Sequence, residues 1–286
     1  MSIAQGSDGL LESSRFEQLS PKQQQLARYI AENPAFAAFA SASSLADRAE
    51  MSTATVVRFA QALGFDGYEE FQQNIRHSYL RTLHPLEVLQ AQDHNGREDA
   101  FSAQLFQDIE NLRRALHSLH VTQLADIAGQ IDKSRQTVVI SSGSYSTVGL
   151  ALSHQLRFLG YPVLFEDRGG PHLTAAIAPL SKNDLLIGIS FWKGNREIVK
   201  ATEWAASRHI PTIAITDTVY SPMAKAAHEC VALPTEGVSF FQSMVAPLSI
   251  VYGIVGHLTR EADEKRKNIM RDAEASYDLL DISFSK

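Results

Sequence analysis

The sequence has little of what marks several classes of protein. It contains one cysteine, Cys230, in 286 residues, so no intrachain disulfide can form, which is typical of a reducing compartment. Its longest mostly apolar run, residues 247–258, is too short for a membrane-spanning helix, which needs about 20 residues. Residues 1–12 lack the basic and apolar regions of a signal peptide. We therefore expect a cytoplasmic protein with no membrane segment.

Positive charge is also scarce. The net charge of −6 argues against a protein that coats nucleic acid non-specifically, although it leaves room for a local DNA-reading surface. Within residues 1–80, nine acidic residues outnumber six basic ones, so any DNA binding there would depend on where single arginines are placed. The apolar share of 44% is ordinary for globular proteins, and the length suggests two domains.

Residues 42–63 have the pattern of a helix-turn-helix. Leu45, Val56 and Phe59 would form the inner faces of two short helices, and Ser52 would cap the second helix. Glu50 occupies the turn, where glycine is usual, and a positive φ there costs on the order of 1 kcal/mol. A plain helical hairpin also fits this pattern. If the motif reads DNA, the residues at the groove are predicted to be Arg48, Ser52, Thr53, Ala54, Thr55 and Arg58.

The rest of the chain has an α/β pattern. A helix near residues 100–119 carries apolar residues on one side, namely Phe101, Leu105, Ile109, Leu112 and Leu116. Short apolar runs follow at 138–140, 162–165, 185–189, 212–215 and 231–233, with helical patterns at 147–159, 196–208 and 223–227 between them. This alternation predicts a parallel five-stranded sheet flanked by helices. Residues 241–280 are predicted to be helical.

Hydroxyl- and glycine-rich loops follow the predicted first and third strands. In an open parallel sheet, ligands bind at the carboxyl ends of the strands, and backbone N–H groups there can hold an anion at a helix N-terminus. The same serines also fit simple helix caps. The predicted effector-binding residues in the two loops are Ser141, Gly143, Ser144, Tyr145, Ser146, Ser190, Trp192, Lys193, Asn195 and Glu197.

Two parts of the chain resemble a known family. The segments 44–49, 52–59 and 63–71 resemble the N-terminal domain of RpiR-family bacterial transcriptional regulators, with Glu50 in place of the family's usual glycine. Residues 125–258 resemble the SIS (sugar isomerase) domain that follows it in that family. The ligand loops match imperfectly, because Ser141 replaces a glycine of the first loop. In the second loop, Trp192, Lys193 and Asn195 stand where serine, glycine and threonine are expected.

The resemblance implies a division into a helix-turn-helix domain (1–80), a helical linker (81–120) and a SIS domain with a C-terminal helix (121–286). It implies a DNA-binding regulator, more often a repressor, that binds a double-stranded operator as a homodimer or homotetramer. Its effector would be a phosphorylated sugar or a sugar acid, and no cofactor or metal is expected. Two alternatives stay open: a SIS domain used only for dimerisation or for a non-sugar ligand, and a sugar-phosphate isomerase. An isomerase needs a positioned acid and base, and Glu197 is the only well-placed carboxylate.

Overall fold

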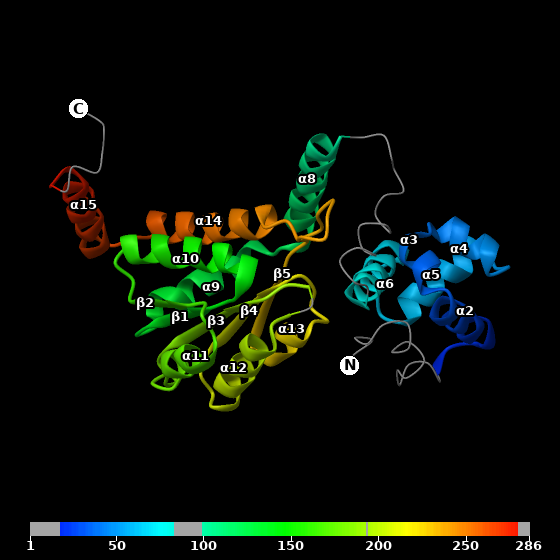
Figure 1. Ribbon diagram of the computed structural model, residues 1–286, viewed down its shortest axis with the longest axis horizontal. Coiled ribbons are helices and arrows are strands. Elements are labelled where there is room, and N and C mark those ends of the chain that lie inside the picture. Colours follow the sequence, from blue (N-terminus) through cyan, green and yellow to red (C-terminus); the bar gives the residue numbers. More distant parts are fainter. Residues whose placement is uncertain (1–17, 83–98, 193, 280–286) are drawn as a thin grey trace. The chain divides into compact units, whose positions relative to one another are not determined.

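The computed structural model describes residues 18–82, 99–192 and 194–279 (Figure 1). The chain divides into two compact units, Met1–Gly96 and Arg97–Lys286. Each unit has its own core, so each is described by itself.

The first unit is helical in its described part. Its helices are α2 (Pro21–Glu32), α3 (Pro34–Phe39), α4 (Ala42–Arg48), α5 (Thr53–Ala62) and α6 (Tyr68–Thr82). Ser20 begins α2 with a capping box, since its hydroxyl accepts from the Gln23 N–H and the Gln23 side chain accepts from the Ser20 N–H. Asn33-Pro34 ends α2, and the proline starts the next helix.

Aromatic side chains hold the first unit together. Phe71 on α6 lies edge-on to Phe59 of α5, with ring centroids 5.4 Å apart, and contacts Phe65 in the same way at 5.5 Å. All three rings are buried. The Tyr68 hydroxyl donates to the Ala40 carbonyl at 2.8 Å, which ties α6 to the end of α3. This core fixes α5 through its inner face and leaves its outer face to solvent.

The second unit contains a five-stranded, fully parallel sheet. Its strands are β1 (Thr137–Ile140), β2 (Val163–Glu166), β3 (Leu185–Ile189), β4 (Thr212–Thr216) and β5 (Glu229–Ala232), in the order β2-β1-β3-β4-β5. The chain changes direction across the sheet between β1 and β3, which is where open parallel sheets usually bind ligands.

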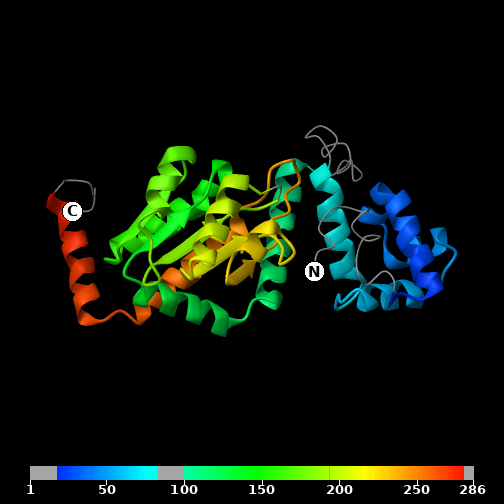
Figure 2. The same ribbon diagram turned by 90° about the horizontal axis from the view of Figure 1, so that it is seen from below.

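Helices cover both faces of this sheet (Figure 1). On one face lie α9 (Val121–Lys133), α10 (Ser146–Phe158) and α14 (Val245–Arg260), whose core includes Val139, Ile187 and Ile213. On the other lie α11 (Gly170–Ile177), α12 (Arg196–Ser207) and α13 (Pro222–Ala226). Figures 1 and 2 show α8 (Ala100–Ser118) and α15 (Glu264–Leu279) at opposite ends of the unit.

The predicted fold class, a helical N-terminal region followed by a five-stranded parallel sheet with flanking helices, is confirmed. Each predicted strand overlaps an observed one. The predicted helix over 241–280 is wrong in two places. Helix α14 begins only at Val245, and the helical conformation is interrupted between Arg260 and Glu264. The Ser243 hydroxyl instead donates to Asp108 of α8 at 2.5 Å, which holds the preceding segment against that helix.

The helix α8 falls within the predicted linker, yet it packs with the second unit. In the described part of the chain, no helix is both long enough and apolar enough to cross a membrane.

Candidate functional site

The first candidate surface is the N-terminal end of α5. The Ser52 hydroxyl accepts from the Thr55 N–H at 3.2 Å, so Ser52 caps the helix as predicted. Ser52, Thr53 and Ala54 are exposed there, while Thr55 is half-buried and also contacts the Ser52 hydroxyl. The three exposed residues form a compact edge that carries two hydroxyls and the positive end of a helix dipole.

Two arginines lie on the same pair of helices. Arg58 is exposed on α5, six residues after the capping Ser52. Arg48 is exposed at the end of α4, and its guanidinium lies 4.8 Å from the centre of the Phe36 ring. Stacking on a ring restrains an arginine without removing its hydrogen-bond donors. All six predicted DNA-contacting residues therefore lie on α4, on α5 or at the α5 cap.

The turn between these helices has the strained geometry expected for a non-glycine residue. Glu50 has φ 53°, in the left-handed region that favours glycine. The next N–H, that of Met51, donates to the Ala46 carbonyl at 2.8 Å and closes the turn. The bond shows that the glutamate keeps the tight turn despite its side chain.

The second candidate site is at the carboxyl ends of the strands. The loop after β1 forms a short 3-10 helix, Gly143–Tyr145, with Gly143 at φ 61°, and α10 starts directly after it at Ser146. Ser141 is buried and its hydroxyl donates to the Ser146 hydroxyl at 3.3 Å, whereas Gly143 and Ser144 are exposed. Gly143 and Ser144 are thus accessible to a ligand, whereas Ser141 and Ser146 bond to each other within the loop.

The loop after β3 is held by internal hydrogen bonds. Trp192 has φ 53°, and its N–H donates to the Asp217 carboxylate at 2.6 Å. The Asn195 N–H donates to the Ser190 hydroxyl at 2.9 Å. The Asn195 carboxamide oxygen accepts from the Glu197 and Ile198 N–H groups and caps α12. The Glu197 and Ile198 N–H groups, which could have bound an anion at the start of α12, therefore already donate to an acceptor within the chain.

Glu197 has a structural contact that the sequence did not indicate. Its Oε2 accepts from the Gly170 N–H at 3.0 Å, at the start of α11, where Gly169 has φ 70°. A Cβ on Gly169 would lie 2.5 Å from that oxygen and would displace the Glu197 carboxylate, and the positive φ of Gly169 also favours glycine there. Glu197 joins the loops that follow β2 and β3.

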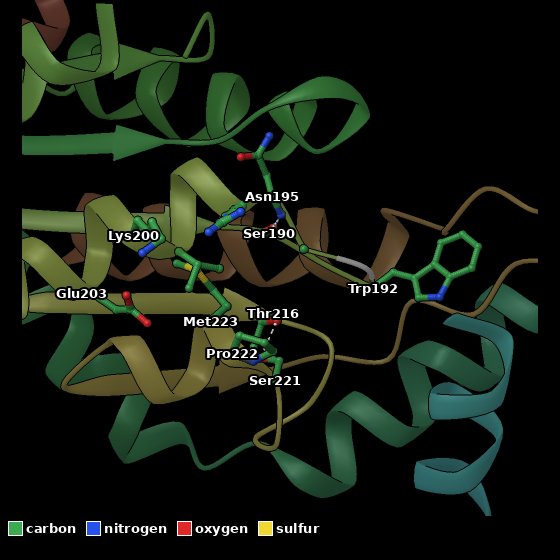
Figure 3. A pocket seen from close by; sticks show the side chains of 12 residues that line it. Ser190, Trp192, Asn195, Lys200, Glu203, Thr216, Ser221, Pro222 and Met223 are labelled. Atoms are coloured by element: carbon green, nitrogen blue, oxygen red, sulfur yellow. Dashed lines mark hydrogen bonds between the residues drawn. The ribbon is translucent and has the colours of Figure 1, made fainter. Parts of the chain in front are cut away.

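A cavity of about 270 Å³ lies beside this loop, between α12 and α13 (Figure 3). Buried hydroxyls of Ser190, Thr216 and Ser221 line it together with the apolar Met223. Three exposed charged residues on α12 also line it, and they are Arg196, Lys200 and Glu203. Two cations against one carboxylate favour an anionic occupant of small size.

The structure brings some of the predicted effector residues to this cavity. Ser190, Trp192 and Asn195 contribute to its lining, whereas none of the predicted residues of the first loop does. Figure 3 shows the Trp192 ring turned away from the other labelled side chains. The two loops nevertheless meet, because the Tyr145 ring lies edge-on to Phe191 at 5.3 Å. Lys193 lies outside the described residues.

Sequence reasoning missed several residues of the site. Arg196 is the first residue of α12 and Lys200 lies one turn further on, so the four-residue spacing places both on the side of the helix that borders the cavity. Asp217 follows β4 and fixes the neighbouring loop through Trp192. Its position in a loop at the carboxyl edge of the sheet was an available signal.

A chain of contacts leads from Trp192 to α8. The Trp192 and Phe240 rings lie 4.8 Å apart, edge to face. The segment that contains Phe240 is bound to α8 at several points: Asn111 Nδ2 donates to the Glu236 carbonyl at 2.8 Å, Arg114 pairs with the Glu236 carboxylate at 2.9 Å, and the Val238 N–H donates to Gln104 at 3.2 Å. Asn111 is fully buried, so its bond to the Glu236 carbonyl is shielded from water, while the Arg114–Glu236 ion pair is partly exposed.

In the part of the chain that the structure describes, no cluster of three metal-ligating side chains is present. The carboxylate that an isomerase would need, that of Glu197, binds the Gly170 N–H. Glu197 thus serves as a structural acceptor between two loops.

Two domain families match the chain. Residues 10–81 match the helix-turn-helix domain of the rpiR family, and residues 130–255 match the SIS domain. A curated relative, an HTH-type transcriptional regulator of Caldanaerobacter subterraneus subsp. tengcongensis that is itself uncharacterized, is 26% identical over 271 residues, which is 92% of this chain and 93% of the relative.

Solved structures show the same architecture. The sugar isomerase domain of an RpiR transcription factor from Sphaerobacter thermophilus is 28% identical, with a TM-score of 0.60, over 62% of this chain and 99% of that one. The Vibrio vulnificus NanR protein complexed with ManNAc-6P matches with a TM-score of 0.61 at 22% identity, over 93% of this chain and 96% of that one. At that identity the second likeness shows the fold alone.

Proposed function

The chain belongs to the RpiR family of helix-turn-helix transcriptional regulators that carry a SIS domain, and we propose that it is a repressor released or engaged by a phosphorylated sugar or a related anionic carbohydrate derivative. The main support for this class of effector is the cavity between α12 and α13, which is lined by Arg196 and Lys200 together with buried hydroxyls. The structural relative NanR was solved with such a ligand, a phosphorylated amino sugar, which supports the same class here.

The DNA-reading surface is the exposed edge formed by Ser52, Thr53, Ala54 and Arg58, with Arg48 beside it. Hydroxyls and helix N-termini suit phosphates, and arginine suits guanine or phosphate. Arg58→Ala is expected to weaken operator binding by about 1–3 kcal/mol without loss of helical structure. The matched control is Arg271→Ala, an exposed arginine of the second unit. Equal losses in both variants would remove Arg58 from the reading surface.

The effector test uses the two cations of the cavity. We expect at least one member of a panel of sugar phosphates, sugar acids and amino sugars to raise the melting temperature, because ligand at a hundredfold excess over its Kd adds about 2.7 kcal/mol of stability. Arg196→Ala/Lys200→Ala is expected to weaken the binding of that ligand tenfold or more, since a hydrogen bond to a charged group contributes about 1.5–3 kcal/mol.

Lys182→Ala is the control for the effector test, because this exposed lysine precedes β3 and so lies at the opposite edge of the sheet. No shift with any compound would favour a SIS domain that serves only dimerisation or binds another class of ligand. The isomerase alternative assigns its carboxylate to Glu197, and that carboxylate already accepts from the Gly170 N–H, which favours a binding site over a catalytic one.

The contacts between Trp192 and α8 supply the route from effector to DNA. A ligand that moves the loop after β3 moves Phe240, and with it the segment that Asn111 and Arg114 hold against α8. Helix α8 is the first described helix of the second unit, and the helix-turn-helix unit precedes it in the chain. Phe240→Ala is expected to leave both separate affinities within about twofold and to reduce the effect of ligand on operator binding. An unaltered response would exclude this route.

A further inference from the structure

Helix α8 has an apolar face that the second unit leaves uncovered. Its other face is packed, with Asn111 and Ala115 buried. Six large apolar side chains of the helix are exposed, and they are Phe101, Leu105, Phe106, Ile109, Leu112 and Leu116. Five of them are the stripe that the sequence places on one side of this helix.

The exposed area is large for a surface that is meant to face water. The exposed fractions of the six side chains add up to nearly four complete side chains. At about 150–200 Å² for each, this is roughly 570–760 Å² of apolar surface, whereas the largest patch on a typical monomer covers about 300–600 Å². If two such faces meet, they bury about 1,100–1,500 Å², which overlaps the range of stable interfaces, about 1,200–2,000 Å².

The spacing of the stripe fits the same helix in a second copy. Leu105, Ile109, Leu112 and Leu116 follow one another at intervals of four, three and four residues, which is the a and d spacing of a heptad repeat. A helix with this spacing packs against another with the same spacing. The stripe is therefore complementary to itself, as a two-fold interface requires.

The aromatic side chains beside the a and d positions indicate how the two helices run. In the heptad register Phe101 flanks these positions on one side and Phe106 on the other, five residues further on. When two copies run parallel, residues at these two places face each other across the interface, so each exposed Phe101 meets the partner helix's Phe106. An antiparallel pairing does not bring them together.

We propose that α8 pairs in parallel with α8 of a second copy of this chain through its exposed apolar face, with Leu105, Ile109, Leu112 and Leu116 at the centre of the contact. The dimer that the proposed function requires would then be held at α8, in the second unit.

The first test is the oligomeric state without DNA or effector. Sedimentation or light scattering is expected to give at least twice the chain mass of 31.5 kDa for the wild type and half the wild-type value for Leu105→Glu/Leu116→Glu. Leu279→Glu is the matched control, because Leu279 is 85% exposed and Leu116 80%. A monomeric wild type, or an unchanged mass in the double variant, would overturn the proposal. Either failure would leave DNA reading and effector binding untouched.

The second test uses variants that keep the stripe apolar. In a Cys230→Ala background, Leu105→Cys and Leu116→Cys each meet themselves across a parallel pair, and both are expected to form disulfide-linked dimers on mild oxidation. The two positions are about 16 Å apart along the helix, so a two-fold axis across an antiparallel pair cannot pass close to both. Absence of cross-linking at both positions would overturn the parallel pairing, while a variant that folds and cross-links at both supports it.

Discussion

A glycine beneath the cavity gives a prediction that the structure makes quantitative. Gly188 lies inside β3, and a Cβ there would overlap the Met223 Cε and lie 2.7 Å from the Thr202 hydroxyl oxygen. Met223 can move, because its thioether end is flexible and it borders the cavity. Thr202 cannot, since it is buried, β-branched and bonded to the Ile198 carbonyl at 2.9 Å.

Gly188→Ala is therefore expected to destabilise the second unit. Overpacking a core costs about 1–3 kcal/mol, and the loss of glycine's freedom in the unfolded chain returns about 0.4–1 kcal/mol. We expect a net loss of about 1–2 kcal/mol. Because Met223 would be pushed toward the cavity, the affinity for an anionic ligand should fall as well.

A second glycine provides the control with the opposite sign. Gly129 lies within α9, and a Cβ there would meet nothing within 4 Å. Gly129→Ala is expected to stabilise the unit by about 0.5–1 kcal/mol, because glycine is a poor helix former.

Both variants are measured by urea unfolding followed through tryptophan fluorescence. The chain has two tryptophans, Trp192 and Trp204, and both lie in the second unit, so the signal reports on that unit. The midpoint should shift with an unchanged slope. A Gly188→Ala variant as stable as the wild type would refute the packing argument, and equal losses in both variants would show that the glycine positions do not differ.

Three further predictions follow from the second unit. Burial raises the pKa of Asp184, but hydrogen bonds from Arg135 and Ser181 outweigh burial and hold the pKa below its usual value. The carboxylate therefore stabilises the fold fully at neutral pH, and this stabilisation is lost as the pH falls below about 3.9. Asp184→Asn should make the stability less dependent on pH in that acid range, as measured by unfolding curves. Asn195→Ala should cost about 1 kcal/mol by removing the α12 cap, while Asn195→Ser should restore most of it. Burial, with a smaller contribution from the charge of Asp217, raises the pKa of Cys230 to about 12, so alkylation by iodoacetamide at pH 8 should be slow in the folded protein and fast in urea.

Each of these has an outcome that would contradict it. Identical acid limbs for wild type and Asp184→Asn would mean that the Arg135 pair does not lower the carboxyl pKa. An Asn195→Ala variant of unchanged stability would show that the cap contributes nothing, and equal alkylation rates in buffer and urea would show that Cys230 is accessible to reagents in the folded state.

Much of the fold was predictable from the sequence because its signals are local. Ser20-Pro21 and Ser52 mark helix starts through capping, and the β-branched runs mark buried strands through their own composition. The strained backbone at Glu50 was also predictable, since Glu50 occupies the turn of the helix-turn-helix pattern, where glycine with a positive φ is usual. The family resemblance likewise rests on contiguous residues.

The arrangement of the candidate site depended on contacts between segments far apart in the sequence. Asp217 holds Trp192, Glu197 holds Gly170, and Phe240 reaches Trp192 from a loop about 50 residues away. The spacing of the apolar stripe on α8 can be read from the sequence, but this periodicity does not show whether the stripe packs against the same chain or against another one. Only the tertiary structure decides which face the rest of the unit covers, because burial is a property of the packed chain.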